Sequence, residues 1–199
     1  MSLENLLRSF ESGLFMEINR GINVLLVLSS DPELVIPIRS YPKIFHHLIS
    51  IYRQSHDFVL YHKKHFPHLF NLMKDESGGG EQDFYEMVMA MERDRTDLFH
   101  NDVASGGFDY RTSSQNRIEY HRERMVAISL IMSNLSFHES NRMYLSEHEE
   151  SFAWSLMVLE TAIDAQDPWI VVQAFKHAFI FLSHIVGYHL AHSPALCTA

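Results

Sequence analysis

Cysteine is almost absent from this sequence. The 199 residues include a single cysteine, Cys197, so no disulfide can form within the chain. Small secreted domains usually depend on several disulfides, whereas proteins of reducing compartments do not. The cysteine count therefore excludes a disulfide framework and favours a reducing compartment.

Positive charge is also scarce. The chain has 16 lysines and arginines against 25 aspartates and glutamates, which gives a formal net charge of -9 at pH 7. Proteins bind nucleic acid largely through clustered cations that displace the counterions of the phosphates. We therefore expect no direct binding of nucleic acid by this region.

Long uninterrupted hydrophobic runs are lacking too. The most apolar window, Trp169–Leu190, contains one lysine and three histidines, and each such residue is costly in hydrocarbon. The first ten residues carry Glu4 and Arg8 in place of the apolar core of a secretory signal. We expect neither a membrane span nor a signal, and we interpret Trp169–Leu190 as a buried helix.

Apolar side chains are abundant, with 46% hydrophobic and 12% aromatic residues. The clearest pattern lies in Arg124–Leu159, where apolar residues recur three and four positions apart up to Leu135. Polar residues then interrupt the pattern, a short segment Asn141–Leu145 follows, and another apolar helix starts near Phe152. This order is typical of one unit of an armadillo or HEAT array. The sequence thus predicts an all-α fold, an armadillo/HEAT-like α-solenoid of two to three repeat units with a loop-rich insertion.

A second copy of this pattern occurs earlier in the chain. Placing Leu28-Ser29 on Leu135-Ser136 gives an offset of 107 residues. Apolar positions coincide at that offset, among them Val24 with Ile131, Leu25 with Met132, Ile36 with Met143, Ile38 with Leu145, Phe45 with Phe152 and Ile49 with Leu156. We predict a first unit in residues 1–52, an insertion in 53–118, a second unit with a following helix in 119–192, and a tail in 193–199.

Glycine and proline predict the boundaries of the first unit. Gly13 separates helices in Leu3–Phe10 and Leu14–Leu28, because glycine readily adopts the left-handed conformation that ends a helix. We expect a short helix in Glu33–Arg39 and a longer one opening at Pro42. The buried face of that longer helix is predicted to carry Ile44, Phe45, Leu48, Ile49 and Tyr52.

The insertion and the last helix carry further predictions. His56–Phe70 is expected to form a separate helix, and Gln82–Phe99 an acidic amphipathic helix rich in methionine. In the final helix we expect Ala174, Phe175, Ala178, Phe179, Leu182 and Ile185 to point inward.

Four segments resemble a known family. They are ESGLFMEINRGINVLLVLSSD (Glu11–Asp31), YPKIFHHLISIY (Tyr41–Tyr52), RMVAISLIMSNLSFHESNRMYLSEH (Arg124–His148) and AFKHAFIFLSHIVGYHL (Ala174–Leu190). Together they are similar to the armadillo-like region of the AT-rich-interaction-domain (ARID) subunits of SWI/SNF chromatin remodellers. The subunit of the PBAF/RSC class is the nearest likeness, and the BAF-class subunit is the alternative.

The resemblance implies a nuclear, non-catalytic scaffold that binds other subunits of a remodelling complex and contributes to transcription regulation. The chain has no ARID domain and no zinc-finger cysteine pair. DNA binding that the family owes to those parts is therefore not implied. No catalytic residue, cofactor or small-molecule substrate carries over either.

Two other functions stay open. His56-Asp57, with His46, His47, His62, His65 and His68 and a distant Asp94 or Asp97, has the residue types of a helical metal-dependent phosphohydrolase. His62, His65 and His68 alone are spaced to share a helix face, but Lys63, Lys64 and Pro67 disfavour zinc there. A free-standing armadillo adaptor would instead bind an extended peptide in a groove, through Asn134 and Asn141.

We predict two surfaces for partner binding. One is the apolar side of the acidic helix, with Phe84, Met87 and Met91, because methionine adapts to irregular apolar contacts. The other is an end of the array, near Leu3–Phe15 or near Trp169–Leu190 with Trp169 at its start. The sequence predicts no polar cap at either end.

Overall fold

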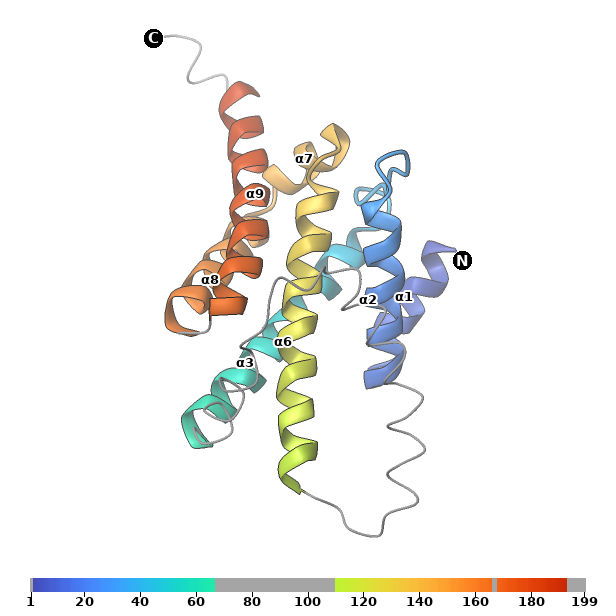
Figure 1. Ribbon diagram of the computed structural model, residues 1–199. Coiled ribbons are helices and arrows are strands. Elements are labelled where there is room, and N and C mark those ends of the chain that lie inside the picture. Colours follow the sequence, from blue (N-terminus) through green and yellow to red (C-terminus); the bar gives the residue numbers. More distant parts are fainter. Residues whose placement is uncertain (1, 67–109, 166–167, 193–199) are drawn as a thin grey trace. The chain divides into compact units, whose positions relative to one another are not determined.

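The computed structural model describes residues 2–66, 110–165 and 168–192, with side chains in 2–66, 117–161 and 172–192. Within these ranges the chain forms seven α-helices and no β-strand, which confirms the all-α prediction (Figure 1). None of the helices in the described ranges is long and apolar enough to cross a membrane.

Residues group into two compact units. The first, called the main unit here, comprises residues 1–57 and 121–199 and contains most of the described helices. The second comprises residues 58–120, whose described part is the end of α3 and the start of α6, with Val59 and Ile118 buried.

The chain begins with two helices, α1 (Leu3–Glu11) and α2 (Phe15–Ser30). The Ser2 hydroxyl accepts a hydrogen bond from the backbone N–H of Asn5 at 3.3 Å and caps α1. Gly13 has φ 67°, as predicted, and this left-handed residue separates the two helices.

Residues 31–41 connect α2 to the next helix. The segment contains turns but no helix, so the expected short helix in Glu33–Arg39 is wrong. Pro32 and Pro37 explain the difference, since proline cannot donate a backbone hydrogen bond and restricts its predecessor to extended conformations. The segment still buries Ile36 and Ile38.

One long helix follows, α3 (Pro42–His65). It begins at proline as predicted, and the five residues expected on its inner face are all buried. The separate helix expected from His56 is wrong, because α3 runs through this point without interruption. No glycine or proline, the residues that commonly end a helix, occurs at positions 53–55.

The central pattern folds in the predicted order. Helix α6 (Tyr110–Leu135) is followed by a tight turn, the short α7 (Glu139–Ser146), and the long α8 (Glu149–Ala165). The chain then forms α9 (Pro168–His192). In Figure 1, α9 and α8 lie at one side of the main unit and α1 and α2 at the other, with α6 and α7 between them.

Aromatic side chains join three helices in the core of the main unit. Trp154 of α8 is 1% exposed and contacts Tyr52 of α3 and Phe181 of α9 edge-to-face, with ring centroids 5.8 Å and 5.1 Å away. This geometry suits the charge distribution of aromatic rings. The inward face predicted for α9 is partly wrong, since Phe175 and Phe179 are exposed and Phe181 is buried instead.

Candidate interaction surface

Several polar contacts in the main unit connect residues at a nearly constant distance along the chain. Six residue pairs join α2, residues 31–41 or α3 to α6, α7 or α8 with partners 103 to 105 positions apart. The contact between Ser55 of α3 and His121 of α6 is the exception, with partners 66 positions apart. The six pairs are Asn19 with Arg124, Ser29 and Ser30 with Asn134, Ile36 and Ile38 with Asn141, and His46 with Glu150. The two stretches therefore run parallel and in register. The separation is slightly smaller than the offset of 107 that the apolar pattern gives.

Asn141 occupies the centre of this register. Its side-chain oxygen accepts a hydrogen bond from the Ile38 N–H at 3.1 Å. Its nitrogen donates to the carbonyls of Ile36 at 2.9 Å and Leu135 at 3.1 Å. Asn141 is fully buried, so the expectation that it lines a peptide-binding groove is wrong. Asn141 instead forms hydrogen bonds with backbone groups of residues 31–41, a segment that has no helical hydrogen bonds of its own.

Asn134 lies near the end of α6 and is partly exposed. Its side-chain nitrogen donates to the hydroxyls of Ser29 at 3.4 Å and Ser30 at 3.3 Å. Both hydroxyls donate to the carbonyl of Leu26, so their oxygens are left to accept. Asn134 thus joins the ends of α2 and α6.

An equivalent contact joins α6 to α9. The Oγ atom of Ser136, which the repeat pattern aligns with Ser29, lies 2.8 Å from Nδ1 of His184. The Ser136 hydroxyl donates to the carbonyl of Ser133 at 2.6 Å, so His184 must carry its proton on Nδ1 and donate it. Burial first, and then the charge of Arg142, lower the pKa of His184. Serine side chains at or just after the ends of α2 and α6 thus link each of these helices to a later one.

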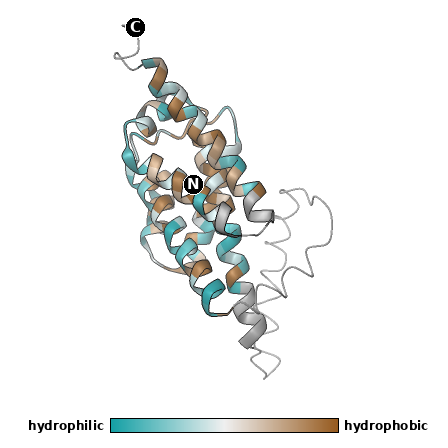
Figure 2. Ribbon diagram, turned by 90° about the vertical axis from the view of Figure 1, so that its left-hand side faces the viewer, coloured by the Kyte–Doolittle hydropathy of each residue, from teal (hydrophilic) through white to brown (hydrophobic). Residues whose placement is uncertain are grey.

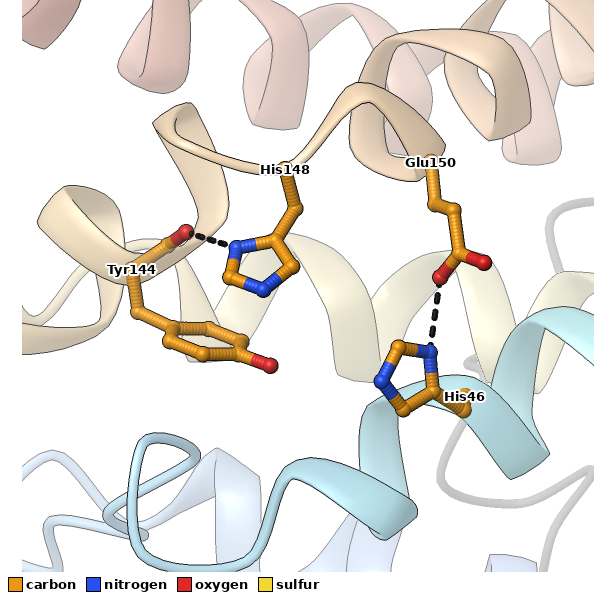
Figure 3. Close-up of polar contacts among 4 residues, drawn as sticks. All are labelled: His46, Tyr144, His148 and Glu150. Carbon is orange, nitrogen blue, oxygen red and sulfur yellow. Dashed lines mark hydrogen bonds and ion pairs between the residues drawn. The ribbon is translucent and has the colours of Figure 1, made fainter.

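A further pair of histidines lies where α3 approaches α7 and α8. Nδ1 of His46 contacts a carboxylate oxygen of Glu150 at 2.7 Å, and both side chains are about half exposed (Figure 3). His148 donates from Nδ1 to the carbonyl of Tyr144 at 2.7 Å, and its ring packs against the Tyr144 ring with centroids 4.0 Å apart. Burial, followed by the charge of Glu150, raises the pKa of Tyr144. These contacts hold the start of α8 against α3.

The residues proposed for metal chemistry are used differently. Nδ1 of His56 contacts Asp57 at 3.2 Å, His46 contacts Glu150, and His62 bonds the carbonyl of Phe58 at 2.9 Å. Among the described residues, no three histidine, cysteine or carboxylate side chains are grouped so as to hold a metal ion. His68, Asp94 and Asp97 lie outside the described residues.

The two ends of the main unit differ in polarity. At one end α1 covers α2 and buries Leu6 and Phe10, while its exposed residues are mostly polar, including Glu4, Arg8 and Glu11. Lys43 of α3 pairs with Glu11 at 3.0 Å. The prediction that neither end has a polar cap is therefore wrong for this end.

At the other end, α9 carries a hydrophobic outward face. The exposed fractions are 59% for Val172, 41% for Phe175, 58% for Phe179 and 52% for Leu190. Phe175 and Phe179 stack on each other with centroids 6.3 Å apart. Figure 2 views the molecule from this side, and hydrophobic residues (brown) recur along the helix that leads to the C-terminus. The inward face, with Ala174, Ala178, Phe181 and Ile185, is fully buried.

The other predicted interaction residues lie outside the described side chains. Phe84, Met87 and Met91 fall in residues 67–109, and Trp169 belongs to the first turn of α9, where side chains are not described. Sequence periodicity missed the outward face of α9 because this helix is apolar around most of its circumference. The three-residue and four-residue steps from Val172 to Phe175 and Phe179 were the available signal.

Comparison with known protein families and with characterised proteins gives no match to this chain.

Proposed function

We propose that this chain is a non-catalytic scaffold that binds other proteins through a stack of armadillo-like units. Residues 14–52 form one unit, α6 to α8 form the next, and α9 begins a third. The in-register pairing of residues 103 to 105 apart carries this proposal. Stacked repeats place each element beside its counterpart, so a constant separation is what such an array requires.

The resemblance to SWI/SNF subunits supports a more particular proposal. The chain would be the helical-repeat region of an ARID-type subunit of the PBAF/RSC class, acting in the nucleus alongside the other subunits. Asn134 and Asn141 belong to the segment that carries part of this resemblance. Their hydrogen bonds to the first unit explain why this segment contains polar residues at these positions.

Affinity purification from nuclear extract tests both levels of the proposal. The tagged chain would be compared with a tagged helical protein of similar size and charge, and retained proteins identified by mass spectrometry. Enrichment of remodeller subunits is the expected result. Stoichiometric recovery of a defined complex without any remodeller subunit would reject the assignment to SWI/SNF but keep the scaffold function. Recovery of no protein above the control would reject the scaffold itself.

The adaptor function is less well supported. Of the two asparagines predicted to bind an extended peptide, Asn141 is buried and its amide is already hydrogen-bonded to three backbone groups. For the phosphohydrolase function, the described residues contain no group of side chains that could hold a metal ion. Elemental analysis showing stoichiometric bound metal in the purified chain would nevertheless revive it.

A further inference from the structure

The outward face of α9 has the properties of a helix-packing surface. Val172, Phe175, Phe179 and Leu190 follow one another in steps that keep them on one side of the helix. Beside them lies a row of small residues, Ser183, Gly187 and Ala191, spaced four apart and all exposed. A Cβ atom built on Gly187 would meet no atom within 4 Å, so the free protein does not need glycine there for space. Large apolar side chains next to small ones let a second helix approach closely.

This face is chemically unlike the opposite end of the main unit. There, α1 buries Leu6 and Phe10 against α2 and turns mostly polar residues outward, while Leu14 and Val27 beside it are exposed. Repeat arrays need such a polar cover at each end, because a unit buries its apolar faces only against its neighbours. In the described part of the chain, α9 has no helix on its outer side. Exposed, contiguous apolar side chains of this kind commonly mark a binding surface.

The charge of α9 indicates what kind of helix would cover it. Residues 168–192 contain no aspartate or glutamate, although the whole chain has a formal charge of -9. Lys176 is exposed on the same side as Phe175 and Phe179, and His189 and His192 follow near the end of the helix. In a parallel pair of α9 helices, Lys176 of one copy would lie against Lys176 of the other, and neither copy would supply a carboxylate. A helix with carboxylates beside its apolar side would complement Lys176.

We propose that the outward face of α9 binds an amphipathic, acidic helix of another protein. The apolar side of that helix covers Phe175, Phe179 and Leu190, and its carboxylates lie near Lys176. The partner's backbone comes closest at Gly187. This inference rests on the proposed scaffold function and names the surface and the partner chemistry that this function would use.

A pair of designed helical peptides tests the inference on the full chain. Both would have three heptads with leucine at the a and d positions. One would carry glutamate at e and g, and the other lysine. Fluorescence anisotropy should show at least about tenfold tighter binding of the glutamate peptide, and this preference should weaken with added salt. Equal binding of the two peptides, or no binding of either, would overturn the proposal.

Three substitutions locate the binding on α9. Phe179→Ser should weaken binding of the glutamate peptide by about tenfold or more, since central aromatic residues dominate helix interfaces. Gly187→Leu should have a similar effect, because its side chain occupies the path of the partner's backbone. Lys176→Glu should reverse the preference between the peptides. Circular dichroism and thermal unfolding confirm that each variant is folded.

Val27→Ser is the matched control. Val27 is 67% exposed on α2, so the substitution removes a comparable apolar side chain away from α9. Peptide binding should remain unchanged. If Val27→Ser weakened binding as much as Phe179→Ser, the peptides would be binding through general hydrophobicity and the inference would be wrong.

Sedimentation velocity separates the proposal from self-association. A dimer that Phe179→Ser dissociates and that the glutamate peptide does not compete with would show that a second copy covers α9, which contradicts the inference. Failure of the α9 surface can also be told apart from failure of the proposed scaffold function. Remodeller subunits recovered equally by the wild-type chain and Phe179→Ser would keep the scaffold and reject this surface. Peptide binding at α9, with no protein recovered from nuclear extract above the control, would keep this surface and reject the scaffold function.

Discussion

The side-chain oxygen of Asn141 lies 3.1 Å from the backbone nitrogen of Ile38, a residue 103 positions earlier in the chain. Both residues are fully buried, and the same amide bonds the carbonyls of Ile36 and Leu135. A single side chain thus supplies hydrogen-bond partners to the Ile38 N–H and the Ile36 carbonyl. It also fixes the register between two stretches that are far apart in sequence.

We expect Asn141→Leu to destabilise the fold strongly. The substitution keeps the size of the side chain but leaves two carbonyls and one N–H buried without partners, at a cost of about 2–4 kcal/mol in the free energy of unfolding. Urea unfolding followed by circular dichroism measures this. Asn134→Ala, at a partly exposed site with long hydrogen bonds, should cost less than about 1 kcal/mol. Similar losses in the two variants would refute the role assigned to Asn141.

We expect Asn19→Asp to stabilise the protein at neutral pH. Arg124 is 6% exposed, donates from two nitrogens to the Asn19 side-chain oxygen at 3.0 Å and 2.6 Å, and lies over the Phe15 ring at 4.5 Å. Burial lowers the pKa of Arg124 to about 10, which reflects the cost of holding its charge away from water. A carboxylate would accept the same hydrogen bonds more strongly and raise the unfolding free energy by about 1 kcal/mol.

The pH dependence of this gain has a definite sign. Arg124 would hold the pKa of the new aspartate below the unfolded value of about 3.9. The added stability would then be present above that value and would be lost as pH falls through the folded pKa. Urea midpoints at pH 7 and at acidic pH, for Asn19→Asp and the natural chain, measure it. A gain that persists in strong acid would show that charge is not its cause.

We expect His177 to make the fold sensitive to mild acid. Burial first, and the nearby charge of Lys176 second, lower its pKa from 6.5 to about 4, and its Nδ1 atom is buried without a hydrogen bond. The folded state therefore binds this proton less well than the unfolded state. The corresponding stability is fully present above pH 6.5 and is lost as pH falls toward 4.

The size of this effect is limited because His177 is partly exposed. We expect a loss of about 1–2 kcal/mol between pH 7 and pH 4.5, measured by urea unfolding at both values. His177→Gln should remove that part of the pH dependence. His189→Gln, at an exposed position of the same helix, should leave it in place. Identical pH profiles for the natural chain and His177→Gln would contradict the prediction.

We expect substitutions of Gly21, which α1 covers, and of Gly187, on the outward face of α9, to change the unfolding free energy in opposite directions. A Cβ atom at Gly21 would lie 2.8 Å from the Phe10 ring, so Gly21→Val should push α1 away from α2 and cost about 1–3 kcal/mol. At Gly187 the added carbon meets nothing, and Gly187→Ala should raise the unfolding free energy by about 0.5–1 kcal/mol through helix propensity. Thermal unfolding of the two variants measures both. Stabilisation by Gly21→Val would show that α1 does not pack as described.

Local sequence signals were reliable where one residue type had one physical consequence. Gly13 predicted a left-handed break, and φ 67° confirms it. Pro42 predicted a helix start, and α3 begins there. The apolar spacing of the first turns of α3 predicted its buried face, because polar residues occupy the other positions. A helix that is apolar all round gives no such contrast, and the inward side of α9 was partly wrong for that reason.

The helical composition of this protein, its short connections at glycine and proline, and the repetition of one apolar pattern at an offset of 107 can all be read from the sequence. The folded structure was needed to find that Asn141 donates and accepts hydrogen bonds in the interior, that α1 covers one end of the main unit, and that Phe175 and Phe179 face outward. Secondary structure follows from neighbours within a few positions, which the sequence displays directly. Which side of a helix is buried depends on residues about a hundred positions away, and only folding brings those together.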